Sequence, residues 1–243
     1  YVNPFVGTDG YGNVYPGAQI PFGGIQISPD TDSRFYDAAS GYKYNHLTLM
    51  GFSLTHLSGT GIPDLGDFLF IPGTGEMKLE PGTHEDPDQG YRSRYSHDKE
   101  WASPNYYAVE LADYGVKAEM TSGVRSGMFR FTYPESDNAF IMIDMNHTLW
   151  QSCEWSNLRM INDSTITGYK LVKGWGPERH VYFTATFSKK LTGLRFVQDK
   201  KPVIYNTSRF RSSYEAWGKN LMACISFDTK AGEEVTVKTA ISA

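Results

Sequence analysis

Cysteine and long apolar runs are both scarce in this chain of 243 residues. The two cysteines, Cys153 and Cys224, are too few for a disulfide framework, and neither lies in a CxxC motif, so a zinc site is not expected. Whether the two thiols pair stays open. No apolar run approaches the roughly 20 residues that cross a bilayer, and no signal peptide is visible at YVNPFVGTDG. We expect any leader to have been removed or to lie outside this sequence.

An excess of positive charge is absent as well. The chain has 23 Lys and Arg against 27 Asp and Glu, for a net charge of −4. This balance gives no electrostatic reason to expect nucleic acid or an anionic membrane as a partner. With 40% hydrophobic and 21% charged residues, the composition is that of a globular protein.

Complete catalytic motifs are also missing. The sequence contains no GxSxG elbow, HExxH, P-loop, GxGxxG or calcium-binding DxDxDG loop, and no His pair has metal-ligand spacing. Glycosidase chemistry needs two carboxylates, and Asp30 with Asp32 or Asp64 with Asp67 are nearby acidic pairs. Such pairs are common, so we expect neither a catalytic residue nor a metal ligand in this chain.

Helical periodicity is weak throughout, and alternation of apolar and polar residues dominates instead. Only 210–219 suggests a short helix or turn. Alternation predicts strands at 18–29, 48–57, 66–72, 105–113, 115–122, 124–134, 139–146, 164–172, 180–188, 193–197, 220–228 and 234–242. So many strands without helical crossovers predict an all-β fold, a large two-sheet antiparallel β-sandwich forming a single domain over 1–243.

Two long segments, 28–46 and 73–104, interrupt this pattern and are rich in Gly, Pro, Asp and Ser. Loops of this length in a compact domain are usually functional or interfacial. Both contain aromatic residues, which predicts that they pack against something: Phe35, Tyr36, Tyr42, Tyr44, Tyr91, Tyr95 and Trp101. Aromatic residues form 14% of the chain, which suits either a sheet protein or a surface that stacks on sugars.

The stretch GFSLTHLSGTG, residues 51–61, begins as a strand and ends as a glycine loop. His56 shares one side of the alternation with Phe52 and Leu54. It is therefore either a hydrogen-bonded core residue or a residue at the rim of a site, with Ser58 in the loop beside it.

Several blocks in order resemble one family, the N-terminal domain of glycoside hydrolase family 92. These are VNPFVGTDGYGNVYPGAQIPFGGIQISPDT, SGYKY, GFSLTHLSGTGIPDLGDFLFIP, YRSRYSHDKEWASPNYYAVEL, DYGVKAEMT, GWGPERHVYFTATFSK and VTVKTAIS. The resemblance covers nearly the whole chain.

The resemblance implies a sandwich of the galactose-mutarotase-like (supersandwich) type, followed in the parent protein by an (α/α)6 domain that is absent here. That second domain would supply the catalytic acid, the catalytic base and most of a calcium site. The parent would be a calcium-dependent, inverting α-mannosidase, of α-1,2 type or related, that is periplasmic, cell-surface or secreted. The expected partners of this domain are its own catalytic domain and mannose-containing glycans, and the chain alone is expected to hold no calcium.

The same resemblance implies that loops of this domain close the leaving-group side of the mannoside pocket. The candidate substrate-binding residues are Phe35, Tyr36, His56, Ser58 and Trp101. Relatives often have Trp before SGYKY, where this sequence has Phe35 and Tyr36, so substrate preference is expected to differ. For His56 the alternative is a bond to a carbonyl of its own loop, and for the aromatic residues it is interface packing.

Two other classes of function stay open. A free-standing carbohydrate-binding module would bind mannosides without the rest of the enzyme. A mutarotase-like epimerase would need a His acid and a carboxylate base at one sugar carbon, with His97 or His180 as the acid.

Overall fold

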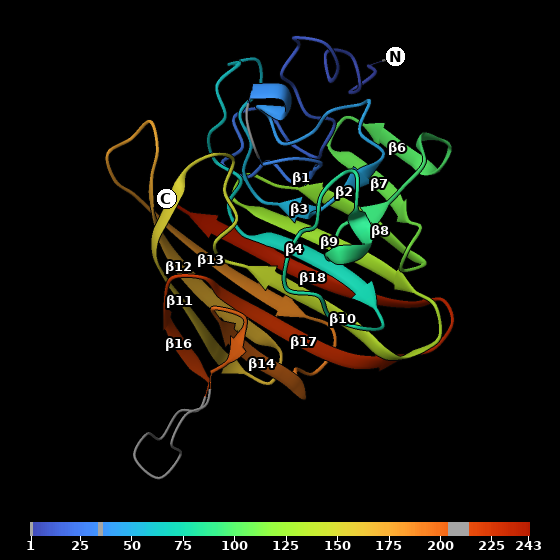
Figure 1. Ribbon diagram of the computed structural model, residues 1–243, viewed down its shortest axis with the longest axis vertical. Coiled ribbons are helices and arrows are strands. Elements are labelled where there is room, and N and C mark those ends of the chain that lie inside the picture. The colour runs from blue at the N-terminus through green and yellow to red at the C-terminus, as the bar shows by residue number, and fades with distance from the viewer. Residues whose placement is uncertain (1, 34–35, 204–213) are drawn as a thin grey trace.

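The structure is a computed structural model that describes residues 2–33, 36–203 and 214–243 (Figure 1). Over these residues the chain forms β-strands and three short 3-10 helices, η1 (Tyr36–Ala38), η2 (Pro87–Gln89) and η3 (His97–Lys99). The strands build two large antiparallel sheets and one short ribbon. The predicted all-β, two-sheet sandwich is therefore confirmed.

The smaller of the two large sheets has seven strands. In spatial order they are β1 (Ser28–Asp30), β3 (Gly51–Ser53), β4 (Leu69–Thr74), β10 (Ser136–Asp144), β17 (Leu221–Thr229), β14 (Gly193–Gln198) and β15 (Lys201–Pro202). The ribbon, β2 (Thr48–Leu49) with β5 (Ser93–Arg94), lies apart from both large sheets.

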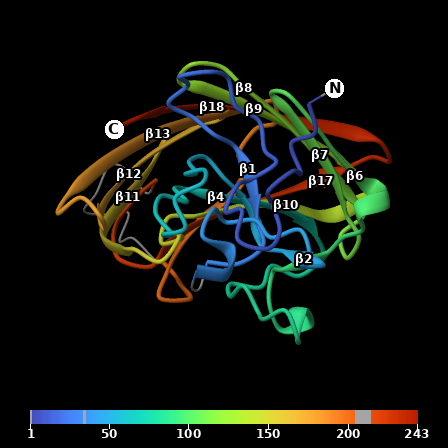
Figure 2. The ribbon, with the colours of Figure 1, turned by 90° about the horizontal axis from the view of Figure 1, so that it is seen from above.

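The larger sheet has nine strands and curves over the smaller one, as the view from above shows (Figure 2). Its spatial order is β16 (Glu215–Gly218), β11 (Ser152–Asn162), β12 (Thr165–Lys173), β13 (Arg179–Phe187), β18 (Glu233–Ser242), β9 (Ser126–Tyr133), β8 (Val116–Ser122), β7 (Tyr106–Leu111) and β6 (Glu100–Ser103).

The main core lies between the two sheets, where alternate residues of each strand point inward. This core includes Val235 and Val237 of β18 and Ile141 and Ile143 of β10, and all four are buried. Each such side chain contributes about 1.5–3 kcal/mol of burial free energy. A second apolar cluster, with Met142 of β10, lies on the opposite face of the seven-stranded sheet, away from the larger sheet.

Most predicted strands are confirmed, but the segment 18–29 is an exception. Only Ser28–Asp30 forms a strand there, and Ala18 and Ile27 make one isolated bridge. Pro21 and the glycine pair that follows it interrupt the ladder, because proline cannot donate and glycine is unfavourable within a strand. The hairpin of β7 and β8 is confirmed.

The predicted helix or turn at 210–219 is wrong over its described part, because Glu215–Gly218 is strand β16, whose Ala216 lies opposite Leu158 of β11. Strand β11 itself was not predicted. The long segments 28–46 and 73–104 contain short strands and 3-10 helices, and their Tyr42, Tyr91 and Tyr95 are buried within this chain.

Candidate binding cleft

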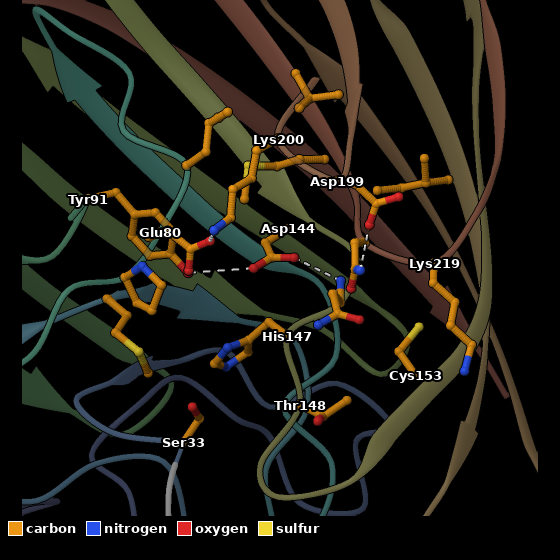
Figure 3. Close-up of a pocket in the computed structure, with 18 of the residues that line it drawn as sticks. Ser33, Glu80, Tyr91, Asp144, His147, Thr148, Cys153, Asp199, Lys200 and Lys219 are labelled. Atoms are coloured by element: carbon orange, nitrogen blue, oxygen red, sulfur yellow. Dashed lines mark hydrogen bonds and ion pairs between the residues drawn. The ribbon is translucent and has the colours of Figure 1, made fainter. Parts of the chain in front are cut away.

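A cleft of about 870 Å³ opens on the face of the seven-stranded sheet that points away from the larger sheet (Figure 3). The ends of β10, β14 and β17 form its floor, and the loop 145–151 with the start of β11 forms one wall. Glu80, Pro81 and Tyr91 from the long segment 73–104 form another. Chain segments far apart in sequence therefore meet here because the sheet order places β10 beside β17.

Asp144, the last residue of β10, is the central polar group of this floor. Its carboxylate accepts a bond from the backbone N–H of Asn146 at 2.8 Å, and the Tyr91 hydroxyl lies 3.5 Å away. Burial raises the pKa of Asp144 above its ordinary value, although the nearby His147 opposes the shift. Burial likewise raises the pKa of Tyr91 well above its ordinary value, so its hydroxyl stays protonated. This pair offers hydrogen bonds to a neutral polar ligand.

One ion pair and one hydrogen-bonded carboxylate occupy the rim of the cleft. The Lys200 ammonium lies 2.5 Å from the Glu80 carboxylate, and the Asn220 amide donates to Asp199 at 2.7 Å. Figure 3 shows the Lys200 side chain reaching toward Glu80. Each of these two rim carboxylates therefore already has a partner within the chain.

Trp150 lines the mouth of the cleft with an unusual backbone conformation. Its φ angle is +74°, a left-handed value that a bulky residue adopts at a cost of order 1 kcal/mol. Neighbouring bonds hold it there: the Leu149 N–H donates to the Leu65 carbonyl at 2.9 Å, and the Thr148 hydroxyl donates to the Gln151 carbonyl at 2.8 Å. The indole is 58% exposed and lies 6.4 Å, between centroids, from the 60% exposed ring of Tyr36.

A buried hydrogen-bond network anchors the loop 145–151 to the interior of the domain. Asp30 accepts from His56 Nε2 at 2.8 Å and from His147 Nε2 at 2.9 Å. Burial alone would raise the pKa of Asp30, but the two imidazoles hold it well below its usual range. His56 completes its bonding through Nδ1, 2.8 Å from the carbonyl of Gln26. His147, which follows β10, is thereby fixed to Asp30 of β1, the strand at one edge of the seven-stranded sheet.

A second buried cluster ties the same loop to the larger sheet. Asp67 has its carboxylate 3.1 Å from the Lys170 ammonium and 2.6 Å from Arg179, and it accepts from Thr55 at 2.7 Å. Burial favours the neutral acid, yet Lys170 and Arg179 lower the pKa of Asp67 to about 2. Lys170 also donates to the backbone carbonyl of His147 at 2.7 Å. A buried lysine of β12 thus holds the loop that carries Trp150.

The structure separates the five predicted site residues. Tyr36 lies beside Trp150 but does not itself line the cleft, and Ser58, exposed in its glycine loop, does not line it either. His56 is buried, and its partners are Asp30, Ser53 and the carbonyl of Gln26 rather than its own loop, so it is a hydrogen-bonded core residue. Trp101 is exposed on β6, an edge strand of the larger sheet. Phe35 lies outside the described residues.

The other candidates also lie outside the cleft. His97 stacks on Tyr44 at 3.9 Å between centroids, and both its ring nitrogens contact neighbours, so it is not positioned as an epimerase acid. His180 lies on β13, where its Nδ1 is 2.9 Å from the Tyr169 hydroxyl. Asp30 and Asp67 are fully buried ion partners, and Asp64 and Asp32 are nearly as buried.

Within residues 2–33, 36–203 and 214–243, no three His, Cys, Asp or Glu side chains lie together as a metal site requires. These residues therefore do not fit a calcium ion held by this domain alone. No helix in the described part of the chain is long and apolar enough to cross a membrane.

Sequence reasoning missed Lys170, Asp144 and Trp150. A signal for Lys170 is present: in TITGYKLVK it falls on the same side of the alternation as Ile166 and Val172, which face the core. A lysine on the apolar side of a strand indicates a buried partner. No comparable signal marks Trp150, whose position depends on a left-handed backbone.

The family model described as "Glycosyl hydrolase family 92 N-terminal domain" matches residues 1–242. The chain belongs to this family. Among curated proteins, the domain is 30% identical over 139 residues to an uncharacterized secreted glycosidase of Arthroderma benhamiae, a match that covers 56% of this chain and 17% of that protein.

Two solved structures superpose on this family 92 domain over nearly its whole length. A family 92 glycosyl hydrolase, ccman5, superposes with a TM-score of 0.80 and 25% identity, covering 99% of this chain and 32% of that one. The family 92 inverting mannosidase BT2199 of Bacteroides thetaiotaomicron superposes with a TM-score of 0.79 and 25% identity, covering 100% of this chain and 31% of that one. The chain thus spans about a third of these solved relatives, and the family resemblance drawn from its sequence is confirmed.

Proposed function

We propose that this domain forms the leaving-group side of the mannoside pocket of an inverting, calcium-dependent α-mannosidase, of α-1,2 type or related. In this proposal it packs on a separate (α/α)6 catalytic domain and binds the substrate without performing the chemistry. The observation that carries the proposal is the cleft mouth, where Trp150 presents an exposed ring beside the exposed ring of Tyr36, on a loop that a buried ion network holds in place. Flat aromatic faces beside hydrogen-bonding groups suit a sugar ring.

The carboxylates of the cleft support a binding role over a catalytic one. An inverting glycosidase needs an acid and a base on opposite sides of the bond, about 6.5–9.5 Å apart, with room for water. Glu80 and Asp199 already have partners at the rim, and Asp144 already accepts from the Asn146 N–H at 2.8 Å and lies 3.5 Å from the Tyr91 hydroxyl. We therefore assign the acid, the base and the calcium to the rest of the enzyme.

The epimerase alternative has weaker support. His147 lines the cleft near Asp144, but its Nε2 is bonded to Asp30 and the residue is almost fully buried. A general acid must reach the sugar oxygen within about 3 Å, which this imidazole does not do while it stays bonded to Asp30. The secreted relative supports the further proposal that the parent enzyme is exported, to the periplasm, the cell surface or the medium.

The test compares two substrates in the presence of calcium: α-mannosyl fluoride, whose leaving group is a single atom, and α-1,2-mannobiose, whose leaving group is a sugar. We expect the complete gene product to hydrolyse both and the 243-residue chain to hydrolyse neither. Trp150→Ala in the complete enzyme should lower kcat/KM for the disaccharide at least about tenfold, and leave the fluoride within about twofold. Tyr11→Ala, at a fully exposed site, is the matched control.

Hydrolysis by the 243-residue chain alone would overturn the assignment of the chemistry to a separate catalytic domain. An equal loss on both substrates in Trp150→Ala would overturn the leaving-group role.

A further inference from the structure

Exposed aromatic side chains gather on the outer face of the nine-stranded sheet, away from the cleft. We call the group formed by Trp155, Tyr169, His180, Tyr182 and Trp217 the aromatic platform. Trp217 is 55% exposed, Tyr182 51% and Trp155 46%, although each belongs to a well-paired strand. Exposed aromatic residues clustered on one face of a sheet mark a binding surface more often than scattered ones do.

Strand register puts the platform on one face. Trp217 of β16 lies opposite Asn157 of β11, Asn157 opposite Tyr169 of β12, and Tyr169 opposite Tyr182 of β13. A second row, two residues along, runs from Trp155 through Leu171 to His180. Residues opposite one another in a sheet share a face, so the two rows form one surface. The intervening Lys170 and Val181 are buried, which turns the platform outward.

The rings support one another before any ligand is present. Tyr169 lies 4.9 Å from Tyr182 and 5.9 Å from His180, between centroids, with interplanar angles of 38° and 25°. The Tyr169 hydroxyl lies 2.9 Å from His180 Nδ1, and the Asn157 amide donates to the carbonyl of Ala216 at 3.1 Å. A surface fixed in this way loses little side-chain entropy on binding.

The size and chemistry of the platform select its ligand. Four strands at about 4.8 Å spacing span roughly 15 Å, and two rows add about 7 Å along the strands. The resulting surface, of order 100 Å², is well below the roughly 800 Å² per partner of a stable protein interface. It matches two to three sugar rings instead. The members of the two rows carry no charged carboxylate, lysine or arginine, which favours a neutral ligand over an anionic one.

We propose that the aromatic platform is a second carbohydrate-binding surface, separate from the cleft, that holds a neutral oligosaccharide by stacking. It would keep the enzyme on a polymeric or branched glycan while the cleft engages a chain end. The choice of an α-mannan as ligand rests on the proposed function, whereas the platform itself rests only on the exposed rings and their register.

The experiment measures binding of the complete gene product to soluble α-mannan, with dextran and xylan as further neutral probes, by affinity electrophoresis and tryptophan fluorescence. Trp217→Ala and Tyr182→Ala should each weaken binding about tenfold or more, and their combination should abolish it. Tyr11→Ala should leave binding unchanged. Hydrolysis of α-1,2-mannobiose by the same variants should stay within about twofold, because the platform lies outside the cleft.

The outcomes separate the two proposals. Binding to dextran or xylan that depends on Trp217 and Tyr182 supports the platform even if the enzyme proves inactive on mannosides. Three results would overturn the platform: binding unaffected by the platform variants, no binding to any of the three polysaccharides, or binding by the 243-residue chain that the complete protein lacks. The last result would mean that the remainder of the enzyme covers this face.

Discussion

Replacing Lys170 by methionine should destabilise the domain by about 3 kcal/mol. The lysine is fully buried, 3.1 Å from Asp67 and 2.7 Å from the carbonyl of His147. Removing one partner of a buried ion pair costs about 3–5 kcal/mol, since it leaves the other charge without full compensation. Arg179, still 2.6 Å from Asp67, moderates the loss toward the lower limit. For a domain of this size, the corresponding fall in Tm is about 6–12 °C.

The assay is urea unfolding at pH 7, followed by tryptophan fluorescence, with Lys99→Met as the control. Lys99 forms an exposed pair with Glu110 at 2.6 Å, and its loss should cost less than about 1 kcal/mol. Asp67→Asn combined with Lys170→Met should cost less than the sum of the two single changes, because neither then leaves the other's charge exposed to the apolar interior. If Lys170→Met lies within about 1 kcal/mol of the wild type, or if the two changes add, the buried network does not hold the loop as argued.

Acid should destabilise the domain as the pH falls from about 4 to about 2. The pKa of Asp67 is lowered from its ordinary 3.8 to about 2, so the contribution of Asp67, about 2 kcal/mol, is present above pH 4 and lost below pH 2. Unfolding free energies measured across this pH range will check the prediction. A domain equally stable at pH 2 and 5 would contradict it. Trp150→Gly should leave the unfolding free energy within about 1 kcal/mol, since glycine relieves the positive φ while the indole is largely exposed; a loss above 2 kcal/mol would show that the ring is packed. Cys153 and Cys224 are both free and buried, so a thiol reagent should titrate two groups after unfolding and react slowly before it, whereas no thiol after unfolding would reveal a disulfide.

Most of the sandwich could be predicted because its strands alternate cleanly, as β12 and β18 do. Strand β11 could not, since a register shift between Cys153 and Trp155 breaks the period of two, and its inner positions include the polar Ser156. Strand β16 is too short to show a period, and its pairing with β11 decides its conformation.

The candidate site was less accessible to sequence reasoning, because its contacts join residues far apart in the chain. The Lys170 ammonium reaches Asp67 across more than a hundred residues, and Asp30 reaches His147 across 117. Of the aromatic residues in the long segments that were expected to pack, Tyr42, Tyr91 and Tyr95 are buried within this chain, whereas Tyr36 and Trp101 are exposed. Tyr36 alone among the described candidates lies beside Trp150, which no motif marked.

Strand β18 is the last strand in sequence but lies in the interior of the nine-stranded sheet, between β13 and β9. During synthesis the two halves of that sheet cannot join until residues 233–242 have left the ribosome. Until then β13 and β9 each present an unpaired, partly apolar edge, which is a template for association with other chains. Folding of this domain is therefore a late event in its own translation, and a chain shortened by even these ten residues would expose both edges permanently.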